Sequence, residues 1–231
     1  MAAPLRTVAI LTARGGSKGL PRKNVLPLAG KPLIAHTVEA ALGCPLIAGV
    51  WVSTDDAEIA AAARLAGAGV IDRPAELALD TSTSSDAVAH AIGALRQEGH
   101  DFSHFALLQP TSPLRTAAHL TECLEQFAAG DFASAISVCE SEHHPQKMLK
   151  LADDGRLVPF SEAADLQRRR QDLPAVYRQN GAIYVMAVED FLTRAEGFYL
   201  EPAMAYVMSH RDSIDIDTAT DLLVAEALLA R

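Results

Sequence analysis

Short apolar runs rich in β-forming residues alternate with helical patterns along most of this chain. The first run, 8–11, leads into a glycine-rich loop, after which a helical pattern begins at Pro32 and reaches Leu42. Such alternation is typical of a mostly parallel sheet with helices packed on its faces. The sequence therefore predicts an α/β fold built on a mostly parallel sheet. The other expected strands are at 50–52, 70–71, 105–108, 133–138 and 182–186, and the other expected helices are at 55–67, 85–97, 116–129 and after Asp217.

The periodic pattern weakens between about residues 140 and 181. Charged residues crowd into this stretch, and Pro159 and Pro174 interrupt it. A chain of 231 residues is of the size of one domain. We therefore expect a single domain over 1–231 with a small inserted arm at about 140–181.

Composition excludes several classes of protein. The chain is 49% hydrophobic and 21% charged, which excludes disorder and coiled coil as its dominant state. Apolar runs fall short of the roughly 18 residues of a membrane span, and the first residues do not resemble a signal peptide. The three cysteines form no CxxC pair, so we expect free thiols in a reducing cytoplasm. His143 and His144 are adjacent and would point to opposite faces of a strand, so they are not expected to share a metal ion.

Positive charge is concentrated at the start of an acidic chain. The formal net charge is −9, yet the first 38 residues contain six lysines and arginines and no Asp or Glu. An acidic protein is a poor general partner for nucleic acid or an anionic membrane. The local basic segment points instead to a small anionic ligand.

The glycine-rich loop at 12–24 is the strongest candidate for that ligand's site. It follows a predicted strand directly, and α/β folds bind ligands at the carboxyl ends of their strands. Its glycines allow close backbone approach, and Arg14, Lys18 and Lys23 are suited to phosphate oxygens. The loop matches neither the Walker A pattern nor GxGxxG. A solvated basic turn is the alternative interpretation.

Two carboxylates near the end of the chain are candidates for a metal site. Asp215 and Asp217 flank Ile216, and in a strand both side chains would face the same side. Two clustered carboxylates repel each other unless a cation lies between them, and Mg²⁺ is the usual cation. The alternative is that Asp217 caps the helix that follows. Asp55 and Asp56 are a rival pair, although they also suit the start of a helix.

The loop motif Arg14-Gly15-Gly16-Ser17-Lys18-Gly19, with Lys23-Asn24, resembles the nucleotide loop of the CMP-sialic acid synthetases (acylneuraminate cytidylyltransferases). Four further segments resemble motifs of the same family, in the same order, along nearly the whole chain. They are Arg73-Pro74-Ala75-Glu76-Leu77-Ala78, Gln109-Pro110-Thr111-Ser112-Pro113-Leu114-Arg115, Arg178-Gln179-Asn180-Gly181-Ala182-Ile183-Tyr184 and Asp215-Ile216-Asp217.

The resemblance implies a Rossmann-like nucleotidyltransferase. Its reaction would transfer CMP from CTP to the anomeric hydroxyl of a nonulosonic acid such as N-acetylneuraminate, releasing pyrophosphate, with Mg²⁺ or Mn²⁺ as cofactor. The family also implies a homodimer in which the arm at 140–181 forms the subunit contact and reaches the neighbour's site. Lys147 and Arg170 would then act across subunits.

The resemblance assigns roles to individual residues. Arg14, Lys18, Lys23 and Asp217 would be catalytic, and Asp215 and Asp217 would hold the metal. No residue of the sequence stands out as a dedicated base, so Asp217 or a metal-bound hydroxide is our candidate. Nucleotide binding is implied for Arg14, Gly15, Gly16, Ser17, Lys18, Lys23, Asn24, Arg73 and Ser84. Binding of the acid is implied for Gln109, Lys147, Arg170, Arg178, Tyr184, Phe198 and Tyr199.

The residues alone leave alternatives open. Arg73 suits a structural ion pair, Ser84 suits a helix N-cap, and Tyr184 and Phe198 suit a core. Legionaminic and pseudaminic acids are rival substrates, whereas Gly16 and Lys18-Gly19 depart from the pattern expected for the eight-carbon acid Kdo. Two rivals come from other classes: a non-catalytic nucleotide-binding module, and a glycosyltransferase that uses Asp55-Asp56 for its metal.

Overall fold

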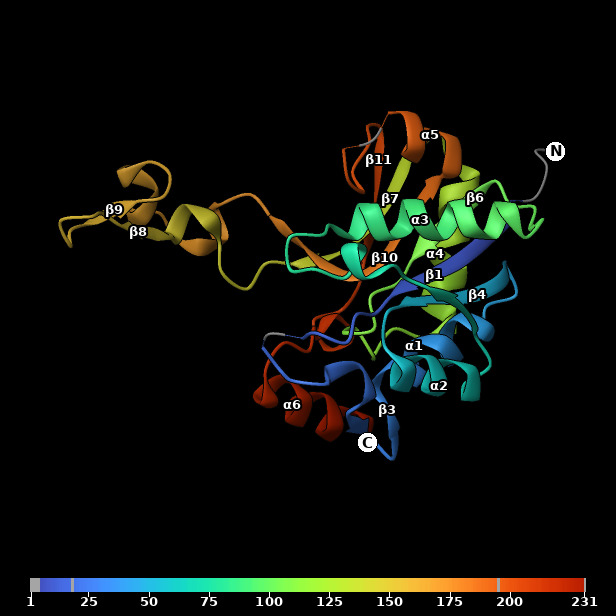
Figure 1. Cartoon of the computed structure of the whole chain (residues 1–231). Coiled ribbons are helices and arrows are strands. Elements are labelled where there is room, and N and C mark those ends of the chain that lie inside the picture. Colours follow the sequence, from blue (N-terminus) through green and yellow to red (C-terminus); the bar gives the residue numbers. More distant parts are fainter. Residues whose placement is uncertain (1–4, 18, 195, 231) are drawn as a thin grey trace.

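Seven strands form the central sheet of the computed structural model, which describes residues 5–17, 19–194 and 196–230 (Figure 1). The strand order is β11-β7-β10-β6-β1-β4-β5. All neighbouring strands are parallel except that β10 is antiparallel to both β6 and β7. The predicted α/β fold with a mostly parallel sheet is therefore confirmed. The strands are β1 (Thr7–Thr12), β4 (Ile47–Thr54), β5 (Gly69–Asp72), β6 (His104–Leu107), β7 (Ser134–Glu140), β10 (Tyr177–Ala187) and β11 (Ala203–Val207).

Helices cover both faces of the sheet, which explains why residues 8–11 of strand β1 are all apolar. The side chains of Ala9 and Leu11 are buried on one face of the sheet, whereas those of Val8 and Ile10 are buried on the other. Burial of each Leu or Ile side chain contributes about 1.5–3 kcal/mol. The first face carries α1 (Leu33–Leu42), α2 (Ala57–Leu65) and α4 (Ala117–Ala129), and the second carries α3 (Ser84–Gln97) and α5 (Val188–Thr193).

A third, smaller cluster joins the last helix to the region after β1. Helix α6 (Ala219–Leu229) packs against the short strand β2 (Pro27–Leu28), which pairs with β3 (Lys31–Pro32). Leu28 and Ile216 are both fully buried in this cluster. The two ends of the chain that carry the predicted site residues are therefore held together by apolar contacts.

Helix starts differ in detail from the sequence predictions. Thr218, not Asp217, caps α6, because its hydroxyl accepts from the N–H of Asp221 while that carboxylate accepts from Thr218. Thr83 and Asp86 form the same reciprocal arrangement, so Ser84 is the first residue of α3 and not its cap. Asp217 and Ser84 are thereby left for other contacts.

Other boundaries follow or correct the expectations. Asp56 caps α2, as the helix-start interpretation predicts, and accepts from the N–H groups of Glu58 and Ile59. Pro32 precedes α1 as its N-cap residue and is not its first helical residue. The sequence prediction also missed α5 and the edge strand β11, which are both short.

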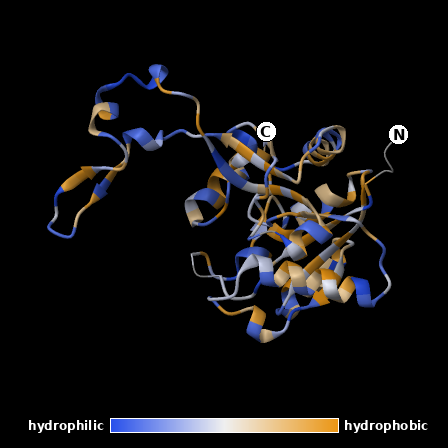
Figure 2. Cartoon of the chain, turned by 90° about the horizontal axis from the view of Figure 1, so that it is seen from above, coloured by the Kyte–Doolittle hydropathy of each residue, from blue (hydrophilic) through white to orange (hydrophobic). Residues whose placement is uncertain are grey.

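The segment between β7 and β10 projects from the body as an arm (Figures 1 and 2). It carries a hairpin of β8 (Leu149–Leu151) and β9 (Leu157–Pro159), together with three 3-10 turns. Large apolar side chains on this hairpin are exposed, among them Leu151 at 72% and Leu157 at 65%. The 3-10 turns are η3 (Pro145–Lys147), η4 (Ala163–Gln167) and η5 (Arg170–Asp172).

Among the described residues, no helix is both long enough and apolar enough to pass through a membrane.

Candidate active site

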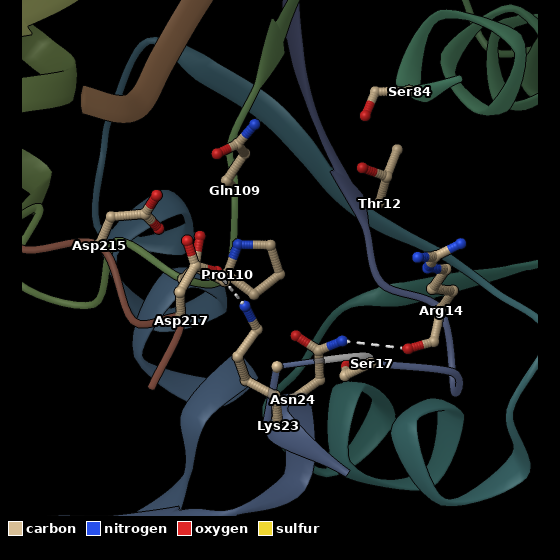
Figure 3. Close-up of a pocket in the computed structure, with 12 residues that line it drawn as sticks. Thr12, Arg14, Ser17, Lys23, Asn24, Ser84, Gln109, Pro110, Asp215 and Asp217 are labelled. Atoms are coloured by element: carbon tan, nitrogen blue, oxygen red, sulfur yellow. Dashed lines mark hydrogen bonds and ion pairs between the residues drawn. The ribbon is translucent and has the colours of Figure 1, made fainter. Parts of the chain in front are cut away.

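A polar cavity of about 370 Å³ lies where β1 and β6 end (Figure 3). The loop after β1, the loop after β6 and the segment before α6 all contribute to its wall. The structure brings together eight predicted residues here: Arg14, Ser17, Lys23, Asn24, Ser84, Gln109, Asp215 and Asp217. The other lining residues belong to the loop and motifs named above but were given no individual role; they are Thr12, Gly19, Pro110 and Thr111.

Cations on one wall of the cavity are paired with carboxylates. The Lys23 Nζ lies 2.8 Å from Asp217 Oδ1, and the Lys23 side chain is only 15% exposed. Arg14 contacts Asp80 Oδ1 at 3.0 Å and donates to the Leu79 carbonyl at 2.9 Å. These pairs keep both cations oriented before an anionic ligand arrives. Lys18, the third predicted cation, is outside the described residues.

The glycines of this loop do not all face the cavity. The Gly15 N–H donates to Asp55 Oδ1 at 3.0 Å, and neither Gly15 nor Gly16 is among the residues that line the cavity. Gly19 does line it, and a Cβ there would lie 2.7 Å from the Asp217 carbonyl oxygen. Glycine at this position therefore lets the loop approach the Asp215–Asp217 segment.

Asp55 and Asp56 are engaged in contacts that stabilise the loop. Asp56 forms an ion pair with Arg22 in addition to capping α2. The hydrogen bond and charge of Arg22 hold the pKa of Asp56 below its usual value. Asp55 accepts from the Gly15 N–H. The structural interpretation of this pair is therefore the better one.

Asp215 and Asp217 face the cavity without being part of a strand, which corrects the expected geometry. Residues 214–217 have no regular secondary structure. The Ile216 N–H donates to the Thr111 carbonyl at 2.8 Å, and its side chain is buried in the third cluster. This anchor turns the two flanking carboxylates into the cavity (Figure 3).

The environment of Asp215 suits a cation. Burial raises the pKa of Asp215, and the charge of Asp217 raises it further, against a hydrogen bond with Thr111. Its Oδ1 atom is buried and has no hydrogen-bond partner among the described residues. The described residues hold no group of three or more acidic, histidine or cysteine side chains that could bind a metal. A metal ion here would therefore complete its coordination with ligand oxygens and water.

A second recess of about 250 Å³ adjoins the cavity and shares Thr12, Arg14 and Ser84 with it. Arg73 lies in this recess and is buried. It donates through Nε to Ser53 Oγ at 3.1 Å and through a terminal nitrogen to the Ser53 carbonyl at 2.6 Å. Burial lowers the pKa of Arg73. The predicted nucleotide residues Arg73 and Ser84 are thus close to the cationic wall.

The residues expected to bind the acid are divided between separate places. Gln109 lines the main cavity. Lys147 and Arg170 instead line a recess of about 420 Å³ at the base of the arm. The Lys147 ammonium donates to the Leu166 carbonyl at 2.9 Å, and Arg170 donates to the Ser141 carbonyl at 3.3 Å. Within one chain, these two side chains do not reach the main cavity.

The three aromatic residues also lie away from the lining of the cavity. Tyr184 is buried, and its hydroxyl donates to Gln179 at 3.4 Å. Phe198 stacks on Phe191 with 5.6 Å between ring centroids. The Tyr199 hydroxyl donates to Glu201 at 2.8 Å. Tyr184 and Phe198 belong to an aromatic cluster of the core, which is the alternative that the residues left open.

A buried hydrogen-bond network supports the site from behind. The Asn180 amide accepts from Ser137 Oγ at 2.6 Å and donates to Ser213 Oγ at 2.8 Å. Ser112 donates to the Asn180 carbonyl at 3.1 Å, and Arg178 donates to the Ser213 carbonyl at 3.3 Å. This network ties β7, β10, the Gln109 loop and the segment before Asp215 together. Sequence reasoning missed Ser137 and Ser213, because a lone serine carries no pattern, and it gave Ser112 no role of its own.

Comparisons with known proteins identify the family of the chain. A sequence model of the family described as "Cytidylyltransferase" matches residues 8–229. The N-acylneuraminate cytidylyltransferase of Streptococcus agalactiae serotype V is 36% identical over 95% of this chain, which spans about half, 52%, of that relative's length. The CMP-N,N'-diacetyllegionaminic acid synthase of Legionella pneumophila is also 36% identical, over 97% of both chains.

A solved structure shares the fold at low sequence identity. A CMP:2-keto-3-deoxy-manno-octonic acid synthetase complexed with CTP superimposes with a TM-score of 0.72 at 18% identity, covering 97% of this chain and 98% of that one. The predicted Rossmann-like nucleotidyltransferase fold is confirmed. The chain belongs to the cytidylyltransferase family, and its predicted place among the CMP-sialic acid synthetases is confirmed.

Proposed function

We propose that this protein transfers CMP from CTP to the anomeric hydroxyl of a nonulosonic acid, with N-acetylneuraminate as the first candidate. The hydroxyl oxygen forms a bond to the α-phosphorus of CTP, and the bond from that phosphorus to the bridging oxygen breaks. Pyrophosphate leaves, and the hydroxyl proton passes to a base. The family and the activity for which the Streptococcus relative is named support this reaction.

One observation carries the proposal: cationic side chains and a pair of carboxylates face each other across one cavity. Arg14 and Lys23 come from the loop after β1, and Asp215 and Asp217 come from the segment before α6. Phosphate oxygens would bind to the cations, because charge-assisted hydrogen bonds to phosphate are strong. The remaining carboxylate oxygens then need a cation between them and the phosphates.

The carboxylates fit Mg²⁺, which would be held by Asp215 and Asp217. The buried Asp215 Oδ1 lacks a partner among the described residues, as expected of an atom whose partner is a metal ion. When bound, Mg²⁺ neutralises phosphate charge and acidifies a neighbouring hydroxyl. The residues of the chain do the rest: Lys23 and Arg14 position the triphosphate, and Asp217 is the side chain we propose to accept the proton. No histidine is among the described residues that line the cavity.

The acid substrate would enter on the Gln109 side of the cavity. A nonulosonic acid carries a carboxylate at its anomeric carbon, and arginine is the residue best suited to bind it. Of the two arginines expected to bind the acid, Arg178 is the one that contacts the segment before α6, since it donates to the Ser213 carbonyl two residues before Asp215. The legionaminic relative makes the same reaction on legionaminic or pseudaminic acid the alternative.

The test is pyrophosphate release from CTP with N-acetylneuraminic, legionaminic, pseudaminic and Kdo acids, each with and without Mg²⁺. We expect one nine-carbon acid to be turned over with a kcat/KM well above the others, and only with the metal. Tight CTP binding without release for any acid would favour a non-catalytic nucleotide-binding module. Hydrolysis or transfer starting from a CMP-sugar alone would favour a glycosyltransferase.

We further propose that the protein works as a homodimer in the cytoplasm. The exposed apolar residues of the β8–β9 hairpin support an association through the arm, because such surface is normally covered. All three cysteines are free and buried, which suits a reducing compartment. Sedimentation of the purified chain tests the dimer, and a monomer at micromolar concentration would contradict it.

A further inference from the structure

Arg115 is the largest fully buried side chain of the described residues, with 2% of its surface exposed. It lies just before α4, at the end of the loop that begins with Gln109. Burial lowers the pKa of Arg115 to about 9, so its guanidinium still carries a charge at neutral pH. Buried charges in proteins are normally paired with an opposite charge. No carboxylate contacts Arg115 within the described residues, so its position calls for another explanation.

The guanidinium bridges two backbone segments next to the cavity. One terminal nitrogen donates to the Ala182 carbonyl at 2.9 Å and to the Gln109 carbonyl at 3.3 Å. The other nitrogens, Nε and Nη2, have no hydrogen-bond partner among the described residues. An apolar side chain of the same size would avoid the cost of burying the charge. What the guanidinium adds is the link between the end of β6 and the middle of β10.

Gln109 is held from a second direction by Gly181. A Cβ at Gly181 would lie 2.3 Å from Gln109 Oε1, so the carboxamide rests directly against this glycine. Gly181 has a φ of +73°, and the next residue supplies the carbonyl that Arg115 binds. Arg115 therefore fixes the backbone of Gln109 to the same bend of β10 that receives its side chain. Figure 3 shows Gln109 across the cavity from Lys23.

We propose that Arg115 is a positioning residue for the acid substrate, which holds the Gln109 carboxamide where it binds a polar substituent of the sugar. This inference rests on the proposed function. A carboxamide offers both a donor and an acceptor, so it can distinguish substituents only while its orientation is fixed. Displacements near 1 Å in a site can lower a rate about 10²-fold.

The variant Arg115→Met tests the inference, since it keeps the length of the side chain and removes both hydrogen bonds. Removing the buried charge offsets part of the cost of leaving two carbonyls without this donor, so the variant is expected to fold with a lower Tm, as the control below is. We expect KM for the acid to rise about tenfold or more, with KM for CTP changed by less than about twofold. Arg115→Lys, which keeps one charged donor, should fall between the wild type and Arg115→Met.

Ser134→Ala is the matched control. Ser134 is also fully buried, and its hydroxyl bridges two backbone groups, donating to the Leu200 carbonyl and accepting from the Leu200 N–H. It lies at the start of β7, in a part of the sheet that does not line the cavity. We expect a lower Tm with both KM values unchanged. The control thus separates the loss of a buried hydrogen bond from the loss of Gln109 position.

A double-mutant cycle shows whether Arg115 acts through Gln109. In a Gln109→Ala background, Arg115→Met should change KM for the acid by less than about twofold, because the group that it positions is gone. Fully additive effects, or equal increases in KM for CTP and the acid, would overturn the inference. So would an Arg115→Met protein with wild-type constants. A wild-type chain inactive with every acid would contradict the proposed function and this inference with it.

Discussion

At the residue scale, the Asp217 carboxylate can pair with either of two cations, Lys23 or a bound metal ion. Its carboxylate pairs with Lys23, and its side chain is 72% exposed toward the space where a nucleotide would bind. Lys23 is far less exposed, so it is the fixed member of the pair. Binding of a metal ion and triphosphate would therefore give each member a new partner: Lys23 would contact phosphate, and Asp217 would contact the metal.

Replacing Asp217 with Asn tests this arrangement. The amide removes the charge and the proton acceptor but keeps the shape. We expect kcat to fall by about 10²-fold or more, with KM for the acid changed little, since the lost interaction acts on the reacting phosphate. Steady-state kinetics measure both constants. Asp190→Asn, which removes a partly exposed acidic side chain of α5 that pairs with Arg194, is the control and should be fully active. Wild-type turnover of Asp217→Asn would contradict the assignment.

At Asp215, we expect the carboxylate that would bind the metal to lower the stability of the metal-free protein. Because burial raises its pKa, the folded state binds the proton more tightly than the unfolded state does. Its carboxylate therefore destabilises the metal-free fold, and the loss grows as pH rises through the folded-state pKa. Asp215→Asn should raise Tm at pH 7 without Mg²⁺ by about 2–4 °C, or about 1 kcal/mol.

Thermal unfolding across pH measures this effect. The gap between Asp215→Asn and the wild type should close as pH falls, because the wild-type carboxyl takes up its proton. Added Mg²⁺ with CTP should raise Tm of the wild type and have little effect on the variant. A variant that is less stable than the wild type at pH 7 without metal would contradict the interpretation that the Asp215 carboxylate, whose buried Oδ1 has no partner among the described residues, destabilises the metal-free fold.

At the scale of elements, the bend in β10 brings the site together. The register of β10 against β7 shifts between Gln179 and Tyr184, and Gly181 in this bend has a φ of +73°. The bend turns the Asn180 side chain toward Ser213 and leaves room for Gln109. An uninterrupted strand would leave both contacts unmade.

Gly181→Ala should therefore have two separable effects. The left-handed backbone conformation costs an alanine about 1–2 kcal/mol. The new Cβ also meets Gln109 Oε1 and would push the carboxamide away. Gly99→Ala is a matched control, since Gly99 has a φ of +83°, has nothing within 4 Å of a Cβ, and lies just after α3, outside the cavity lining and the arm. Both variants should lose stability, and only Gly181→Ala should raise KM for the acid. Equal KM values for the two variants would argue against the contact.

The same elements show how far the sequence could predict the structure. Strands β1 and β6 were predictable because both of their faces are buried, which requires continuous apolar runs. The edge strand β11 was not, since its five residues alternate between buried and exposed side chains over too short a span. The basic loop was predictable from its glycines and cations. Its pairing with Asp80 and Asp217 was not, because those contacts join residues far apart in the sequence.

At the scale of the whole molecule, the predicted site residues of one chain lie in two separate places. The cavity with Lys23 and Asp217 is in the body, whereas Lys147 and Arg170 are at the base of the arm. The arm projects from the body and exposes an apolar hairpin. Association of two chains through the arms would cover this surface, and it would let each arm serve the other chain's cavity.

Mixing two inactive variants tests whether each arm completes the cavity of the other chain. Asp217→Asn is defective in the body, and Arg170→Ala is defective in the arm. If the arm serves the partner, each mixed dimer contains one site with both defects and one site with neither. Because an equal mixture gives half mixed dimers after subunit exchange, about one quarter of wild-type activity should return.

The control for this experiment is a mixture of Asp217→Asn with Lys23→Met. Both substitutions lie in the same cavity of the body, so every site in a mixed dimer keeps one defect and no activity should return. Recovery in the first mixture alone would place the arm residue at the partner's site. Dimers that form, as seen by sedimentation, without recovery in either mixture would mean that each arm serves its own chain, and Arg170 would then have to reach its own cavity by movement of the arm.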